Sequence, residues 1–285
     1  MEIGLALAGG GIRGAVHIGV IKAIQEENIK INYISGTSSG SIVAAMYAMG
    51  YNCEEILEFL KKYCKKIKYV EFKTILKLIY GGVFKNKLII DGLNSGEIIE
   101  KLMGEIAKNK GIYNINQIKM PLYIPTVDIK SGEILYFGSK QNIKKLENNE
   151  KYLNQGNIGR IVRASCSYPV IFSPCKYKNT QLIDGGIREN LPWKILKKNN
   201  VENIIGVCFD KNINEKCCLN IIDVINNSLD ILIDELNIYE REGINKLINI
   251  KTENIGLLDM KEINYLYNLG YKEGKKQIKK INKKR

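Results

Sequence analysis

A serine with a glycine two residues away on each side is the first candidate for chemistry in this sequence. The run Gly36-Thr37-Ser38-Ser39-Gly40 has the G-x-S-x-G spacing of a nucleophile elbow, the sharp turn that presents a serine hydroxyl between a strand and a helix. Glycines 36 and 40 let the two elements pass closely while the serine backbone is held under strain. A glycine- and serine-rich turn that only caps a helix fits the same residues, so both interpretations stay open.

A second glycine run precedes the serine, in Gly9-Gly10-Gly11-Ile12-Arg13-Gly14. Successive glycines let backbone N–H groups converge at a helix N-terminus, where the helix dipole adds positive potential. Donors aimed at a developing oxyanion commonly stabilise the transition state by about 2.7–4 kcal/mol each. The run therefore predicts an oxyanion hole near Ser38. For Arg13, structural hydrogen bonding, holding this loop and attracting anionic substrates all remain open.

The same glycines also satisfy G-x-G-x-x-G, the fingerprint of a dinucleotide-binding loop. That fold needs an acidic residue at the end of its second strand to hold the ribose. Here the corresponding strand ends Tyr33-Ile34-Ser35-Gly36, and the nearest acids, Glu26 and Glu27, lie at the end of the preceding helix. The sequence thus lacks the second requirement of a nucleotide site.

A serine nucleophile needs a base, and the chain has a single histidine, His17. It lies inside the first predicted helix, whereas hydrolases with this elbow place their histidine late in the chain, after the acid. We therefore expect His17 to have a packing role and the base to be a carboxylate. An aspartate is intrinsically a weak base, but burial can raise its pKa and binding can align it with Ser38.

Two aspartates are candidates for that base. Asp184 ends a predicted strand, residues 181–183, and is followed by Gly185 and Gly186, which allow close approach to a serine from another strand end. Asp128 also follows a strand, but it lies beside a Lys-Ser-Gly turn, where aspartate is a routine turn former. The sequence favours Asp184.

The elements that must position these residues alternate regularly at the N-terminus. Strand 2–8, helix 15–27, strand 31–35 and helix 41–49 follow one another, which is the order of a parallel α/β sheet flanked by helices. Because adjacent parallel strands end at the same edge of a sheet, the glycine loop and Ser38 should face each other.

The remaining chain continues this sheet after an interruption. Residues 51–115 break the alternation and predict a helical cap over the site, including a basic amphipathic helix over 52–70. Residues 139–157 are polar and predict a loop with some helix. The other predicted strands are 121–128, 134–137, 181–183, 204–209 and one within 247–258, and the other predicted helices are 96–108, 161–167, 192–198, 219–242 and 261–281. We expect a single domain over residues 1–285.

Composition narrows the class of protein. The 285 residues are 45% hydrophobic and 26% charged, which is ordinary for a globular domain, and the formal net charge is +13. The excess lies in residues 61–77 and in a basic C-terminal tail, 272–285. Solvated surface is the favoured explanation, and attraction to an anionic partner is the alternative. Because no nucleic-acid motif is present, we expect no nucleic acid, and the anionic partner would be a membrane, contacted peripherally through the tail.

The chain also lacks obvious targeting and metal-binding features. The N-terminus has no basic segment before an apolar run, and no apolar run reaches the roughly 18 residues that span a bilayer. Seven scattered cysteines, including the adjacent Cys217 and Cys218, indicate reduced thiols, and with one histidine they form no convincing metal-ligand set. We expect a cytoplasmic protein, peripheral at the membrane at most, without metal or cofactor.

Four motifs in order resemble those of the bacterial patatin-like phospholipases. They are the two glycine runs described above, Ala164-Ser165-Cys166-Ser167-Tyr168-Pro169, and Asp184-Gly185-Gly186-Ile187-Arg188-Glu189-Asn190-Leu191-Pro192. The likeness covers about residues 1–210. The closing run Gly256-Leu257-Leu258-Asp259 and a helix containing Gly270-Tyr271 also resemble the C-terminal part of bacterial members. Each motif alone is weak, whereas four in order are specific.

The resemblance implies a three-layer α/β fold and a lipid acyl hydrolase that uses a Ser–Asp dyad without histidine. Ser38 would be the nucleophile, Asp184 the base, and the backbone N–H groups of Gly10, Gly11 and Ile12 the oxyanion donors. Gly9, Arg13, Gly14, Gly36, Gly40, Gly185 and Gly186 complete the motifs. The implied substrate is a phospholipid or another fatty acyl ester. A lipid-binding or acyl-transferring member with little hydrolytic activity is the alternative.

Overall fold

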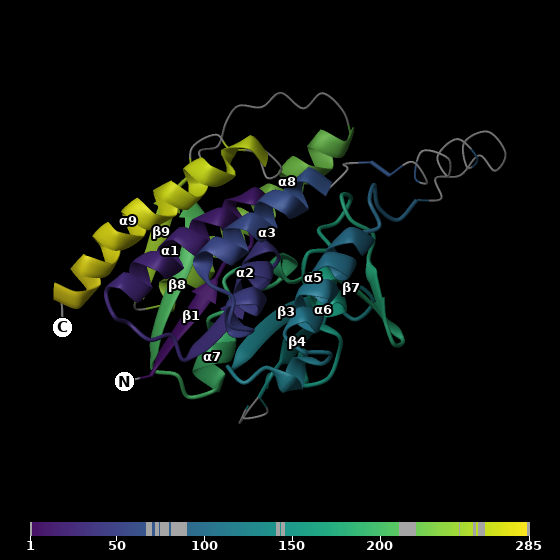
Figure 1. Ribbon diagram of the computed structural model, residues 1–285. Coiled ribbons are helices and arrows are strands. Elements are labelled where there is room, and N and C mark those ends of the chain that lie inside the picture. The colour runs from purple at the N-terminus through teal and green to yellow at the C-terminus, as the bar shows by residue number, and fades with distance from the viewer. Residues whose placement is uncertain are drawn as a thin grey trace.

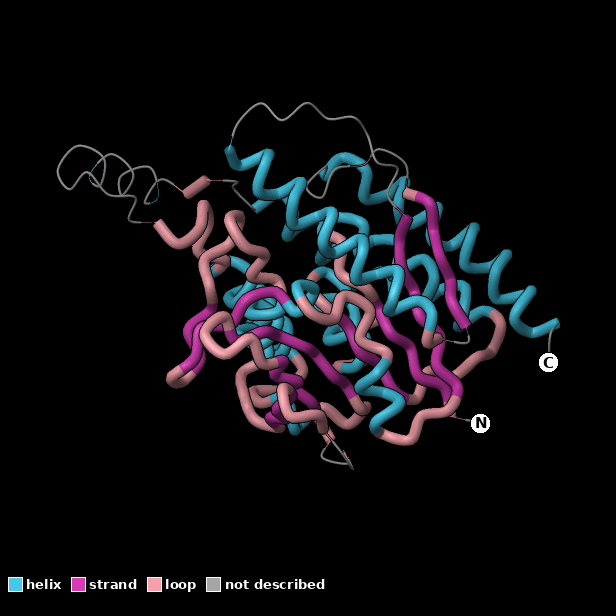
Figure 2. Tube along the Cα trace, turned by 180° about the vertical axis from the view of Figure 1, so that it is seen from behind, coloured by secondary structure: helices cyan, strands magenta, loops and turns pink. Residues whose placement is uncertain are grey.

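The computed structural model describes residues 2–66, 70–71, 74, 80, 90–140, 143, 146–210, 221–244, 246–252, 255 and 260–283. Within them, one mostly parallel sheet forms the centre of the molecule, with helices on both faces (Figures 1 and 2). Its strands are β1 (Ile3–Leu7), β2 (Tyr33–Gly36), β3 (Leu122–Asp128), β4 (Ile134–Gly138), β5 (Glu150–Leu153), β6 (Cys175–Tyr177), β7 (Thr180–Asp184), β8 (Asn203–Asp210) and β9 (Lys246–Lys251). This arrangement confirms the predicted α/β fold class.

The order of the sheet explains why the first strand is so apolar. It runs β5-β4-β3-β2-β1-β8-β9, and β7 pairs with β3 and β6. β1 lies between β2 and β8, parallel to both, and every residue of β1 is buried. A central parallel strand is covered on both faces, so it requires the continuous apolar run that the sequence shows there.

Two helical layers sandwich the sheet. The larger contains α1 (Gly14–Glu26), α2 (Ser39–Ala48), α3 (Cys53–Lys66), α5 (Glu97–Asn109), α6 (Ile158–Ser165) and α9 (Ile263–Lys283), and the smaller contains α7 (Lys194–Lys198) and α8 (Ile221–Glu242) (Figures 1 and 2). The described part of the predicted cap, residues 51–115, thus supplies α3 and α5 to the larger layer. Among the described residues, no helix is both long and apolar enough to span a membrane.

The last helix includes most of the basic C-terminal segment. α9 packs along α1, and Gly19 and Gly270 lie at their crossing, where a Cβ on Gly19 would come within 2.1 Å of the Tyr267 carbonyl oxygen. Ile278, within the segment, is fully buried. Residues 272–283 therefore belong to a packed helix with exposed lysines on its outer side.

Two strands lie where the sequence analysis placed none. β5 pairs in parallel with β4, in a segment predicted as loop with some helix, and that prediction is wrong for residues 150–153. β5 is a half-exposed edge strand flanked by polar residues, so its apolar alternation is weak. β6 has only three residues and pairs with β7. Part of the basic stretch 61–77, Cys217 and Cys218, and the run 256–259 lie outside the described residues.

Candidate active site

Ser38 lies at the turn between β2 and α2, as the elbow pattern predicts. Its backbone has φ 52° and ψ −124°, a conformation that non-glycine residues rarely adopt. Gly40 makes the turn possible because a Cβ there would lie 2.5 Å from the Leu7 carbonyl oxygen. The Ser38 N–H donates to Ser165 Oγ at 3.0 Å, and this contact with α6 holds the turn in place.

The glycine loop follows β1 and lies beside this turn. The Gly9 N–H donates to both the backbone oxygen and Oδ1 of Asn190, at 3.2 and 3.1 Å. Gly11 has φ 59°, which suits a residue without a Cβ. In the part of the chain that the structure describes, the N–H groups of residues 10–12 donate to no protein acceptor. All three residues line the same pocket as Ser38, so these donors are available to a ligand.

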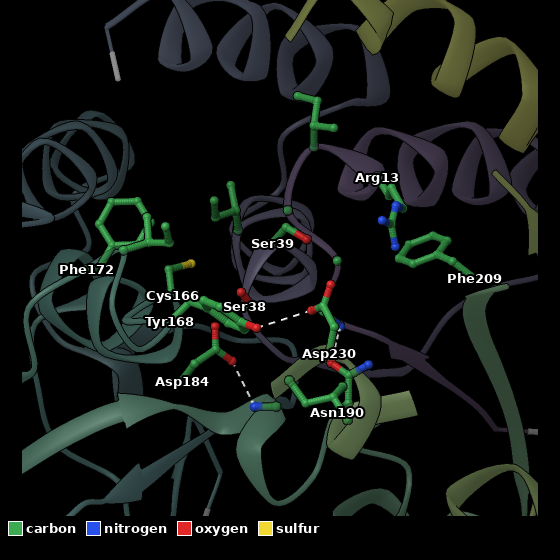
Figure 3. A pocket seen from close by; sticks show the side chains of 18 of the residues that line it. Arg13, Ser38, Ser39, Cys166, Tyr168, Phe172, Asp184, Asn190, Phe209 and Asp230 are labelled. Atoms are coloured by element: carbon green, nitrogen blue, oxygen red, sulfur yellow. Dashed lines mark hydrogen bonds between the residues drawn. The ribbon is translucent and has the colours of Figure 1, made fainter. Parts of the chain in front are cut away.

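Asp184 ends β7 and lies beside Ser38 in that pocket (Figure 3). Its Oδ1 accepts the Gly186 N–H at 2.8 Å, while Oδ2 is buried and accepts no hydrogen bond of ordinary geometry from the described residues. Burial raises the pKa of Asp184 to about 7, against the opposing effects of the Ser38 hydroxyl and the Gly186 N–H. A buried carboxylate with one free oxygen next to a serine hydroxyl can accept that hydroxyl's proton near neutral pH.

The pocket around these groups is mainly apolar. It has a volume of about 140 Å³, and its apolar walls come from α2, α3, α8, β8 and the segment after α6. The apolar side chains that line it are Ile12, Ile42, Leu60, Tyr63, Ile171, Phe172, Phe209 and Ile233. A pocket of this kind suits a hydrocarbon chain whose polar end reaches the glycine loop.

The two residues that the sequence analysis disfavoured as bases have structural contacts. His17 is fully buried in α1, its Nε2 lies 2.7 Å from the Ala8 carbonyl oxygen, and its ring packs against Phe209. Burial lowers the pKa of His17 to about 4. Asp128 accepts from the Ser131 hydroxyl at 3.1 Å and the Lys130 N–H at 3.2 Å, as a turn former does. Neither residue lines the pocket.

Arg13 lies at the pocket edge, where its guanidinium is nearly buried. It donates to the Ile255 carbonyl oxygen from both Nε and Nη2, at 3.4 and 3.2 Å. Burial lowers the pKa of Arg13, while the negative charges of Asp230 and Asp234 on α8 raise it. Arg13 therefore makes structural contacts that tie the glycine loop to the C-terminal part of the chain.

Sequence reasoning assigned no role to a group of polar residues behind the glycine loop. Glu240 on α8 accepts the N–H groups of Asn190 and Leu191, at 2.9 and 2.8 Å, and Asn190 Nδ2 donates to Asn237 at 2.9 Å. Asn190 in turn accepts the Gly9 N–H with its side-chain and backbone oxygens. Asn237 and Glu240 lie three residues apart on one helix face, but such spacing alone cannot identify a partner almost 50 residues earlier.

Known proteins resemble this chain in sequence and in fold. Residues 5–197 match the family model described as patatin-like phospholipase. A Candida albicans protein named lysophospholipase NTE1 is 30% identical over 207 residues, which cover 72% of this chain and 13% of that protein. An uncharacterized Bacillus subtilis protein, YqhO, is 27% identical over 214 residues, covering 73% and 71%. The crystal structure of VipD from Legionella pneumophila superimposes with a TM-score of 0.52 and 15% identity, covering 97% of this chain and 66% of VipD. VipD thus shares the fold.

Proposed function

Since the chain belongs to the patatin-like phospholipase family, we propose that it is a serine lipid acyl hydrolase that works through an acyl-enzyme. The observation that carries the proposal is the position of Asp184. It is buried in the same apolar pocket as the strained Ser38, and its Oδ2 accepts no hydrogen bond of ordinary geometry from the described residues. Ser38 is the nucleophile and Asp184 its base. The proposed substrate is a phospholipid or another fatty acyl ester, and a cytoplasmic location stays a prediction.

The reaction follows from the positions of these groups. Asp184 accepts the hydroxyl proton while Ser38 Oγ attacks the ester carbonyl carbon, and the N–H groups of Gly10, Gly11 and Ile12 stabilise the oxyanion. Collapse of the tetrahedral intermediate expels the alcohol, which takes the proton from Asp184. A water activated by the same carboxylate then hydrolyses the acyl-enzyme.

His17 is a poor alternative base because of its surroundings. Its Nε2 is engaged with the Ala8 carbonyl oxygen, its Nδ1 is buried, and its low pKa makes it a weak proton acceptor. The mechanism therefore needs only one serine and one carboxylate from the described residues of the pocket.

The proposal is tested with a water-soluble ester, p-nitrophenyl butyrate, on purified protein. Ser38→Ala and Asp184→Asn should each lower kcat/KM by about 10³-fold or more. Ser39→Ala and His17→Gln, which change neighbouring polar groups, should stay within about tenfold of wild type. Hydrolysis that survives Ser38→Ala would refute the proposed nucleophile. A wild type that binds fatty acid without turnover would favour the lipid-binding alternative.

A further inference from the structure

Helix α8 exposes an apolar face to solvent. Ile221, Ile231 and Leu232 have 74%, 69% and 66% of their surface exposed. Val224 and Ile225 are exposed between them, and Ile238 and Tyr239 continue the stripe toward the C-terminal end of the helix. The exposed positions recur at helical spacing, so they form one apolar stripe, which monomeric proteins rarely leave in contact with water.

The opposite face of α8 is polar and is bonded to the protein. Asp230 accepts from the Tyr168 hydroxyl at 3.2 Å, Asn237 accepts from Asn190, and Glu240 accepts two backbone N–H groups. Turning the helix to bury its apolar stripe would break these bonds. The inner contacts therefore fix the rotation of α8 and keep the stripe outside.

The face of α8 opposite the stripe lines the active-site pocket. Ile233 and Asn237 of α8 and Leu60 and Tyr63 of α3 line that pocket. Figures 1 and 2 both place the start of α8 beside the end of α3. The stripe therefore forms the outer side of a helix whose inner side is part of the pocket wall.

The charges around the stripe differ between its two ends. Near the start of α8, the end of α3 carries the exposed Lys62, Lys65 and Lys66. Toward the end of α8, the exposed Glu235 and Glu242 interrupt the stripe. Within residues 221–232 the exposed side chains of the stripe are thus apolar except for Ser228, and the two acids of this segment, Asp223 and Asp230, are half-buried. This half of the stripe lies next to positive charge, a combination that complements an anionic lipid surface.

We propose that residues 221–232 of α8 and the lysines at the end of α3 form a docking face for an anionic phospholipid bilayer. The apolar side chains insert among the headgroups while the lysines contact lipid phosphates, so that a helix lining the pocket lies against the bilayer that holds the acyl ester. The proposal rests on the proposed function, since it names where that site meets its substrate.

This face is distinct from the basic end of α9. Figures 1 and 2 both place the C-terminus far from the start of α8. Lys279 and Lys280 are exposed there without a comparable apolar stripe in the described part of α9. The two basic regions therefore give different predictions for mutants.

The test measures sedimentation of the protein with vesicles of phosphatidylglycerol and phosphatidylcholine. The double variant Ile231→Asp/Leu232→Asp should bind vesicles about tenfold or more weakly, and Lys62→Glu/Lys65→Glu about fivefold or more weakly at low salt. Tyr113→Asp, at an exposed aromatic in the segment that precedes β3, and Lys279→Glu/Lys280→Glu, on α9, are matched controls that should bind like wild type.

Two further measurements separate the explanations. Hydrolysis of p-nitrophenyl butyrate by Ile231→Asp/Leu232→Asp should stay within about twofold of wild type, which shows an intact site. If the wild-type protein binds vesicles but hydrolyses no ester, the proposed docking face is retained and the proposed function is refuted. Unchanged vesicle binding by the double variant would overturn the docking face. A wild-type dimer that this variant converts to monomers, with vesicle binding unchanged, would assign the stripe to a second copy.

Discussion

Two walls of the active-site pocket are held in place by different kinds of interaction. The wall made by the glycine loop and the Ser38 turn consists of backbone in close contact, and Gly40 leaves no room for a side chain beside Leu7. The wall made by α8 is held through polar side chains, with Asn237 and Glu240 bonded to the segment after β7. The first wall thus depends on steric fit, and the second on hydrogen bonds that span the chain.

The largest expected effect tests the steric wall. Gly40→Ala would place a Cβ 2.5 Å from the Leu7 carbonyl oxygen and 2.8 Å from that of Ala8, so the turn or β1 must move. We expect a loss of about 3 kcal/mol or more in unfolding free energy, and loss of ester hydrolysis. Urea denaturation and the p-nitrophenyl butyrate assay measure both.

The control is a glycine in open space. Gly104 lies in α5, and a Cβ added to it would have no neighbouring atom within 4 Å, so Gly104→Ala should raise the unfolding free energy by about 0.5–1 kcal/mol. A Gly40→Ala protein as stable as wild type would show that the elbow tolerates a side chain and that the steric account is wrong.

The next largest expected effect is on the pH dependence of activity, and it concerns Asp184, the carboxylate between the two walls. Because Asp184 must be ionised to accept the Ser38 proton, and burial raises its pKa to about 7, kcat/KM should fall about tenfold per pH unit below pH 7. The activity should level off above that value. A pH profile of p-nitrophenyl butyrate hydrolysis checks this expectation.

Glu189 provides the control for that profile. It is another buried carboxyl whose pKa burial raises to about 7, but it bonds to Tyr136 and does not line the pocket. Glu189→Gln should therefore keep the midpoint near pH 7. A midpoint that disappears in this variant would mean that Glu189, rather than Asp184, sets the pH dependence.

The steric wall could be predicted from the sequence for a physical reason. Close approach of strand and helix allows few residue types, so Gly36 and Gly40 mark the turn locally, and the short strand–turn–helix order fixes where Ser38 lies. Asp184 was identifiable because two glycines follow it at a strand end. The structure brings both residues to one pocket, while their catalytic roles stay predictions.

The α8 wall could be predicted only as a helix over 219–242. In that stretch apolar and acidic residues alternate around the helix, so the pattern does not reveal that Glu240 faces inward and Leu232 outward. The partners that decide the rotation, such as Asn190, lie about 50 residues earlier. The edge strand β5 was not predicted for a related reason. Its sequence mixes polar and apolar residues, and it forms a strand because it pairs with β4.

Three buried carboxyls in and around the pocket predict an unusual dependence of stability on pH. Burial raises the pKa of Asp184 and Glu189 to about 7 and that of Glu240 to about 8. A carboxyl with a raised pKa in the folded state stabilises the fold below its unfolded pKa, and this stabilisation is lost as the pH rises through the folded value. Between pH 6.5 and 8 the unfolding free energy should therefore fall by about 2–3 kcal/mol.

Thermal unfolding measured between pH 6.5 and 8 tests this expected fall in the unfolding free energy. The buried His17, whose pKa is lowered to about 4, contributes stability that is lost only as the pH falls below about 6.5, so it does not offset the effect. Glu240→Gln, which keeps the shape of the side chain, should flatten the dependence. A melting temperature that rises from pH 6.5 to 8 would contradict the assignment of these three groups.

The smallest expected effect, that of Asn190→Ala on kcat, tests whether the two walls are coupled through Asn190. Asn190→Ala removes the side-chain acceptor of the Gly9 N–H and the donor to Asn237 on α8. The backbone oxygen of residue 190 still accepts from Gly9, so the loop loosens without being released. We expect kcat for p-nitrophenyl butyrate to fall about tenfold with KM little changed, because a displaced donor weakens transition-state binding more than substrate binding.

A double-mutant cycle with Asn237→Ala decides where that loss arises. If α8 positions the glycine loop through this bond, Asn237→Ala alone should lower kcat several-fold, and the two changes together should cost less than their sum, with a coupling of about 1 kcal/mol. Additive effects would mean that Asn190 acts on Gly9 independently of α8. The glycine loop would then be positioned independently of α8. Binding of a lipid surface to α8 would in that case not affect the oxyanion donors through Asn190.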